Sequence, residues 1–125
     1  MKIEELRLGN ITKQGIVFMI GYDRGILGCW FIKNKYDSFA DGFVKADDIE
    51  PIPLTPEILE KAGFERCDKS LYYYYWKTIS GLEVEIINNH LLTKINNVRI
   101  NKVGYVHQLQ NLIFTLTGEE LEIKL

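Results

Sequence analysis

The sequence is poor in the residues that most enzyme sites require. It has two histidines and two cysteines, and none of them stands in a metal-binding spacing such as HExxH or CxxC. Glycine-rich phosphate loops and the GxSxG turn are also missing. We therefore expect no catalysis, no metal and no cofactor. One alternative stays open, in which Cys29 or Cys67 acts as a nucleophile with a distant His107 as base.

Long apolar runs and an excess of one charge are absent as well. The longest apolar stretches, around residues 16–20 and 26–32, are broken by glycine and too short to span a bilayer. The first seven residues lack the apolar centre of a signal peptide. A net charge of −2 gives no general attraction to nucleic acid or to an anionic membrane. These absences predict a cytoplasmic protein with free thiols and no membrane contact.

What is present predicts an α+β fold. Short β-branched and aromatic runs between glycine turns indicate an N-terminal SH3-like small β-barrel over residues 1–50. Prolines predict an extended junction over residues 51–63, which ends in a short helix that Thr55 caps and Pro56 begins. Residues 64–125 indicate an antiparallel sheet packed by a C-terminal helix, and the two parts can form one compact unit. Glycine and asparagine, which adopt the left-handed conformation readily, predict turns between the strands of this sheet at Ser80–Gly81, Asn88–Asn89 and Asn96–Asn97.

The C-terminal block predicts that helix through its spacing. Apolar residues recur there every three or four positions, which places them on one side of a helix. They are Val106, Leu109, Leu112, Ile113 and Leu116. Gly118 is suited to the left-handed conformation that ends a helix. The alternation over residues 121–125 predicts a last short strand.

Partner binding is the function that these elements favour. The tyrosine run predicts that Tyr73 and Tyr75 share the sheet face that the closing helix leaves uncovered, and tyrosine is common at interfaces. The polar side of the closing helix adds His107, Gln108 and Asn111. The sequence therefore predicts a non-enzymatic protein-interaction module, whose partner is another protein or a second copy of the chain.

Weak nucleic-acid binding is the alternative. Residues 86–118 include no Asp or Glu, so this part of the chain is locally basic. The candidate residues are Lys94, Arg99 and Lys102, with Tyr105 able to stack on a base. Three cations are few beside the phosphate contacts of typical binders, which makes this the second hypothesis.

Three blocks of the sequence resemble a family of small proteins from gut anaerobic bacteria and from their phages and mobile elements. They are the opening at residues 3–10, the junction at residues 48–55, and the closing block at residues 105–121. Ile113 and Thr115 stand where the family pattern has tyrosine and alanine. The resemblance implies an accessory protein of a phage or mobile element, and it transfers no catalytic residue.

Overall fold

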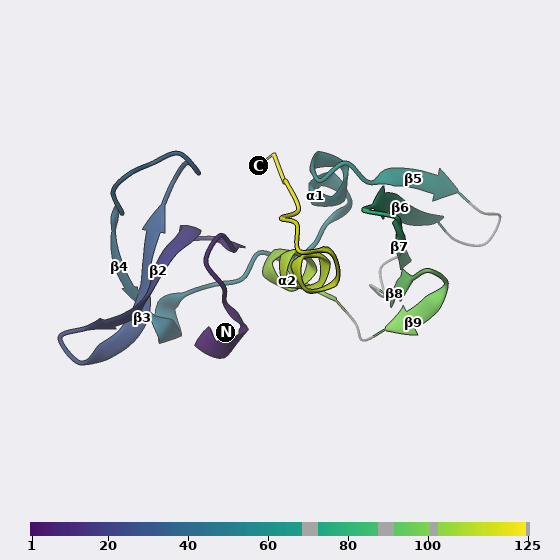
Figure 1. Cartoon of the computed structure of the whole chain (residues 1–125). Helices are drawn as coiled ribbons and strands as arrows, with labels where there is room; N and C mark the ends of the chain where they lie inside the picture. Colours follow the sequence, from purple (N-terminus) through teal and green to yellow (C-terminus); the bar gives the residue numbers. More distant parts are fainter. Residues whose placement is uncertain (69–72, 88–91, 101–102, 125) are drawn as a thin grey trace. The chain divides into compact units, whose positions relative to one another are not determined.

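The computed structural model describes residues 1–68, 73–87, 92–100 and 103–124, and it confirms the α+β class (Figure 1). No helix in these ranges is both long and apolar enough to cross a membrane.

The chain divides into two compact units. Unit 1 consists of Met1–Pro53 and Tyr105–Asn111, and unit 2 of Leu54–Gly104 and Leu112–Leu125. The first division falls close to the predicted end of the N-terminal part. The second falls within the closing helix, whose first half groups with the N-terminal sheet. The sequence had placed the whole helix with the second sheet, because periodicity reports an apolar stripe and not what the stripe packs against.

Unit 1 is a curled half-barrel of four antiparallel strands in the order β1-β2-β3-β4 (Figure 1). The strands are β1 (Ile11–Thr12), β2 (Gly15–Asp23), β3 (Ile26–Ile32) and β4 (Gly42–Lys45), with single 3₁₀ turns at Ile3–Glu5 and Ala46–Asp48. Positive φ at both Arg24 and Gly25 makes the β2–β3 connection a type I′ turn, the form that matches strand twist. The described sheet is an open half-barrel, so a closed SH3-like barrel remains a prediction.

The core of unit 1 lies on one face of this sheet. Its buried members come from the two strands β2 and β3 and from two flanking segments, and they are Leu6, Val17, Cys29, Phe31 and Ile49. Met1, Ile3 and Val44 pack against them. The N-terminal segment thus contributes apolar side chains to a core that β2 and β3 build, which fixes its course over the sheet.

Unit 2 contains a five-stranded antiparallel sheet in which sequence neighbours pair throughout, in the order β5-β6-β7-β8-β9. The strands are β5 (Glu65–Asp68), β6 (Tyr73–Ile79), β7 (Leu82–Ile87), β8 (Leu92–Ile95) and β9 (Val98–Ile100). Both residues of the Ser80–Gly81 and Asn96–Asn97 turns have positive φ, which confirms the turns predicted there. A further predicted turn at residues 88–89 lies outside the described residues.

The helix α1 (Pro56–Lys61) confirms the local prediction for the junction. The Thr55 hydroxyl oxygen accepts a hydrogen bond from the Ile58 N–H at 3.2 Å, and Pro56 occupies the first turn. At the other end, Lys77 donates from Nζ to the Ala62 carbonyl at 2.8 Å. This cation satisfies a terminal carbonyl of the helix, where the dipole also favours positive charge.

The closing helix α2 spans Val106–Thr117. Gly118 follows it with φ of 74° and donates its N–H to the Phe114 carbonyl at 2.8 Å, as predicted for a helix stop. The predicted last strand is wrong, since Leu121–Lys124 does not form a strand. Leu121 is nevertheless buried, so an apolar residue at this position reflects burial and does not require a strand.

Candidate functional site

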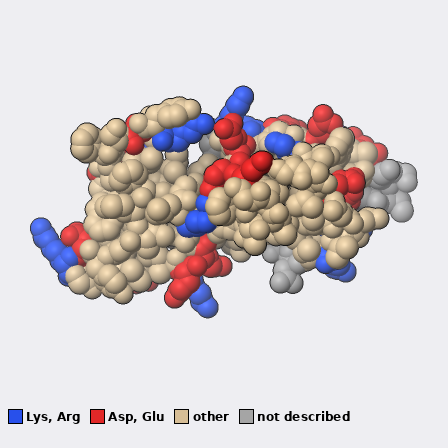
Figure 2. Space-filling view, in the orientation of Figure 1, with Lys and Arg blue, Asp and Glu red and all other residues tan. Residues whose placement is uncertain are grey.

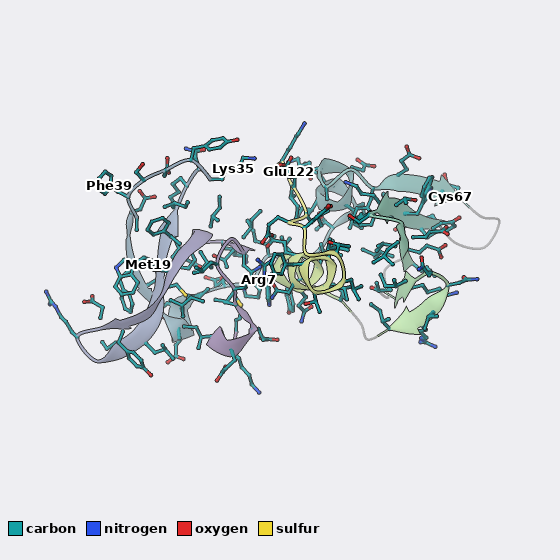
Figure 3. All side chains as sticks on the ribbon, in the orientation of Figure 1. Arg7, Met19, Lys35, Phe39, Cys67 and Glu122 are labelled. Atoms are coloured by element: carbon teal, nitrogen blue, oxygen red, sulfur yellow. The ribbon has the colours of Figure 1, made fainter. Side chains whose placement is uncertain are left out.

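Two amide side chains of α2 hold the N-terminal segment of unit 1. The Asn111 Nδ2 group donates to the Glu5 carbonyl at 2.8 Å. Asn111 Oδ1 accepts from Asn10 Nδ2 at 2.8 Å and from Arg7 Nε at 3.2 Å. Gln110 accepts from the Ile11 N–H at 2.8 Å. Figure 3 shows Arg7 beside α2, where this network forms.

Asn10 is the centre of this network, and its side chain is 0% exposed. Its Oδ1 accepts from the Arg7 N–H at 2.7 Å, while its Nδ2 donates to Asn111. Gln110, 2% exposed, completes the arrangement by donating to the Gly9 carbonyl at 3.2 Å. Buried amides are tolerated when both ends are bonded. The opening and closing blocks of the sequence are therefore bonded to each other, over about a hundred residues of chain.

His107 lies inside unit 1 with 1% of its surface exposed. Neither ring nitrogen has a hydrogen-bond partner among the described residues. Its ring stacks on Tyr105 with centroids 6.0 Å apart. Burial lowers the pKa of His107, and the N-terminal amine also lowers it, whereas the nearby Glu5 carboxylate acts in the opposite direction. The imidazole is therefore held in its neutral form.

Gln108 has a local structural role at the start of α2. Its Oε1 accepts a hydrogen bond from the Tyr105 N–H at 3.2 Å, as a side chain at this position does in a capping box. The three closing-block residues that were predicted to form a partner surface thus all contribute to the structure of unit 1. His107 is buried, Gln108 caps the helix, and Asn111 binds the N-terminal segment.

The tyrosine pair lies on the buried face of unit 2. Tyr75 is 2% exposed, and its neighbours across the strands include the buried Ile86. Tyr73 meets Tyr75 edge to face with centroids 6.1 Å apart, and the Arg66 guanidinium lies 4.2 Å from the Tyr73 ring centroid. The sequence assigned the two faces the wrong way round. Alternation separates the faces correctly but carries no information on which one the core covers.

The predicted basic residues are only partly brought together. Lys94 and Arg99 are direct cross-strand neighbours on β8 and β9. On its other side Lys94 faces Glu85, which faces Trp76, which in turn faces Glu65. This row across unit 2 carries two acidic and two basic side chains and is neutral. Lys102 lies outside the described residues, and Tyr105 belongs to unit 1.

The thiols give little support to nucleophilic chemistry. Cys29 is fully buried in the unit 1 core, and burial raises the pKa of its thiol. A raised pKa keeps the sulfur protonated, whereas the thiolate is the reactive form. Cys67 is half-buried on β5 in unit 2. Among the described residues, no group of three His, Cys, Asp or Glu side chains is arranged to hold a metal ion.

Unit 1 has an apolar surface that the sequence pattern did not predict. Met19, Trp30 and Phe43 are cross-strand neighbours on β2, β3 and β4, on the face opposite the core. We call these three residues the outer apolar strip. Trp30 and Phe43 meet at a centroid distance of 4.7 Å, and Met19 is 46% exposed.

Glycines make this strip shallow and close-packed. Gly28 lies under the Phe43 ring, and a Cβ there would collide with the Val44 carbonyl oxygen. Gly21 lies beside Trp30, with which an added Cβ would be in contact at 3.6 Å. Glycine in a strand marks such close approach. Two strand glycines at neighbouring positions, next to aromatic residues, were the signal in the sequence that could have revealed the strip.

Exposed apolar side chains are concentrated in unit 1. Most of the exposed large hydrophobic residues in the described parts of the chain belong to it, and they are Leu8, Met19, Ile20, Tyr22, Ile26, Tyr36, Phe39 and Tyr105. Unit 2 contributes Val98, Phe114 and Leu116. Figure 2 shows few charged side chains over the half-barrel strands in this view, and Figure 3 labels Met19 and Phe39 on that unit. Larger exposed apolar patches mark interaction sites.

No family model, curated protein or solved structure matches this chain.

Proposed function

We propose that this protein is a non-enzymatic, cytoplasmic binding module that holds another protein on the outer apolar strip of unit 1. The observation that carries the proposal is the row of Met19, Trp30 and Phe43 on the sheet face away from the core. Aromatic residues and methionine are enriched at the centres of interfaces. The strip is continuous across three strands, which gives a partner a preformed surface.

The amides and imidazole of the closing block are not part of this proposal. Their side chains serve the fold of unit 1, and Tyr75 serves the core of unit 2. The assignment to the accessory proteins of phages and mobile elements rests on the resemblance of the three sequence blocks. An SH3-like relationship for the half-barrel is likewise a proposal, supported by its four short, curled antiparallel strands.

Site-specific photo-crosslinking tests the strip in cells. A benzophenone amino acid at Phe43 keeps an aromatic ring on β4, and we expect it to yield one discrete adduct with another protein. Tyr74 is the matched control, because it is also a half-buried aromatic residue on a sheet face, but in unit 2. Equal adducts from both positions, or none from Phe43, would contradict the proposal. An adduct containing only the protein itself would also contradict it.

Nucleic-acid binding through Lys94 and Arg99 is the second candidate. It is favoured by their cross-strand pairing and by the half-buried Trp76 in the same row. The neutral balance of that row opposes it, since affinity for nucleic acid depends mainly on unpaired cations meeting phosphates. Fluorescence anisotropy with single- and double-stranded DNA and RNA decides between the candidates. Micromolar binding that falls steeply with salt and is lost in the Lys94→Gln, Arg99→Gln double variant would establish the second one.

A further inference from the structure

The strands at the edges of the two sheets differ in how they are protected. An exposed edge offers unpaired N–H and C=O groups to another strand, and proteins protect edges with charge, proline or short length. In unit 2, β5 carries Glu65, Arg66 and Asp68 within four residues, and β9 has three residues including Arg99. In unit 1, β4 has four residues and ends in Lys45. Each of these three edges is short and charged.

The fourth edge lacks such protection. The short strand β1 pairs with β2 only at Gly15 and Ile16, and backbone bonds from Gly9 and Asn10 extend this as far as Val17. A bulge follows between Val17 and Met19. Beyond the bulge, the backbone of residues 19–23 is hydrogen-bonded to β3 alone among the described residues. This part of β2 is an edge although the strand is nine residues long.

Composition makes this free stretch suited to strand pairing. Residues 15–22 contain no charge and no proline. Met19 is 46%, Ile20 39% and Tyr22 70% exposed, so apolar side chains project from both faces of the strand. An uncharged, apolar, exposed edge is the condition in which strands associate between molecules.

We propose that the free edge of β2 pairs antiparallel with the same edge of a second copy of this chain, about a two-fold axis at Gly21. This register places Ile20 of each copy opposite Tyr22 of the other, and these two side chains lie on the same face of the sheet. Aromatic and β-branched residues form favourable cross-strand pairs. Gly21 meets its own counterpart at the axis, where the absence of side chains removes any steric conflict.

Charge favours a second copy as the occupant. Asp23 and Arg24 are the first charged residues at the end of the stretch, and antiparallel pairing places the two copies of each at opposite ends of the interface. No like charges therefore meet. A two-fold contact of this kind closes on itself and yields a dimer. The paired edge is short, so we expect a dissociation constant on the order of 10 μM.

Sedimentation velocity over a concentration series tests the proposal with the intact protein. We expect a shift from one copy to two copies as concentration rises. The Ile20→Lys variant sets lysines beside the axis and should weaken association by about tenfold or more. Ile26→Lys is the matched control, because Ile26 is a similarly exposed isoleucine that lies on β3 and not on the free edge of β2. It should leave association unchanged.

Each outcome bears on the proposal. A wild-type protein that stays a single copy throughout would overturn it, as would equal losses from the two lysine variants. Should Ile20→Lys fail to fold, hydrogen exchange of the wild-type protein replaces it. Those amides of residues 19–23 that do not bond to β3 should then gain protection with concentration, while those of β5 should not. If the dimer proposal fails, the proposed binding of another protein to the outer apolar strip is not affected, since the crosslinker at Phe43 reports on β4 and on a different partner.

Discussion

The two units of this protein are stabilised in different ways. In unit 2, each strand pairs with its neighbour in sequence, and tight turns such as Ser80–Gly81 set the registers. In unit 1, amide side chains of α2 hold a segment about a hundred residues away in sequence. Unit 2 therefore depends mainly on local hairpins around an apolar face, whereas unit 1 also depends on a buried polar network between the two ends of the chain. Apolar burial tolerates small errors of shape, but a polar network must be satisfied at every atom.

The largest expected effect tests the apolar face of unit 2. Tyr75→Ser removes a ring that is 2% exposed, and it should lower the free energy of unfolding by about 3 to 5 kcal/mol. Tyr74→Ser changes the adjacent, half-buried residue on the other face and should lower it by about 1 kcal/mol. Urea denaturation followed by circular dichroism measures both. Equal losses would contradict the assignment of Tyr75 to the core face.

The second effect tests the polar network of unit 1. Asn10→Ala leaves the Arg7 N–H without its acceptor and Asn111 without one of its donors, so we expect a loss of about 2 to 3 kcal/mol. Asn34→Ala, at an exposed position in the same unit, should stay within about 0.5 kcal/mol.

A double-mutant cycle measures the interaction free energy between Asn10 and Asn111 apart from their other contacts. If Asn10 and Asn111 act together, the Asn10→Ala, Asn111→Ala double variant should lose less than the sum of the single variants, by about 1 kcal/mol. Strict additivity would show that the two amides stabilise unit 1 independently, and unit 1 would then differ less from unit 2 than the structure indicates.

This contrast also explains what the sequence could predict. The Asn96–Asn97 turn, the Thr55 cap and the Gly118 stop each depend on residues a few positions apart, and all three are confirmed. The bond between Asn10 and Asn111 has no local signature, because amide spacing says nothing about a distant partner. The same limit applies to faces: alternation paired Tyr73 with Tyr75 correctly, yet only the folded sheet shows which face is buried.

The same limit on contacts between distant residues applies to the candidate binding surface. The outer apolar strip brings together single residues of three strands, and Met19 joins it only because a bulge at residue 18 resets the register. Apolar strands could therefore be predicted from the sequence, but the row of residues across them could not. The predicted basic segment shows the same limit, because its Lys94 lies opposite Glu85, which belongs to another strand.

A third prediction concerns pH and unit 1 alone. Burial holds the pKa of His107 in the folded protein below its value in the unfolded chain. The unfolded chain therefore takes up a proton first as pH falls below about 6.5, and stability is lost with a slope of up to about 1.4 kcal/mol per pH unit until the folded pKa is reached. Above the unfolded pKa both states are neutral and this contribution is flat.

The measurement compares wild-type protein with His107→Leu at several pH values by urea denaturation. Because carboxylates titrate in both proteins, the informative quantity is the difference between the two unfolding free energies. It should change below about pH 6.5 and be constant above it. A difference that is constant at every pH would mean that the folded protein protonates His107 as readily as the unfolded chain does.

The smallest expected effect tests whether the hydrogen bond of the Thr55 cap stabilises α1 in unit 2. Thr55→Ala removes the side-chain acceptor of the Ile58 N–H and should cost about 1 kcal/mol. Thr115→Ala, at an exposed position within α2, makes the same chemical change where no cap is involved. Alanine has the higher helix propensity, so this second change should be neutral or stabilising by a few tenths of a kcal/mol.

Effects of opposite sign from the same substitution would locate the contribution in the cap hydrogen bond. Equal losses would instead point to contacts of the threonine methyl group, and α1 would then resemble unit 1 in depending on tertiary neighbours.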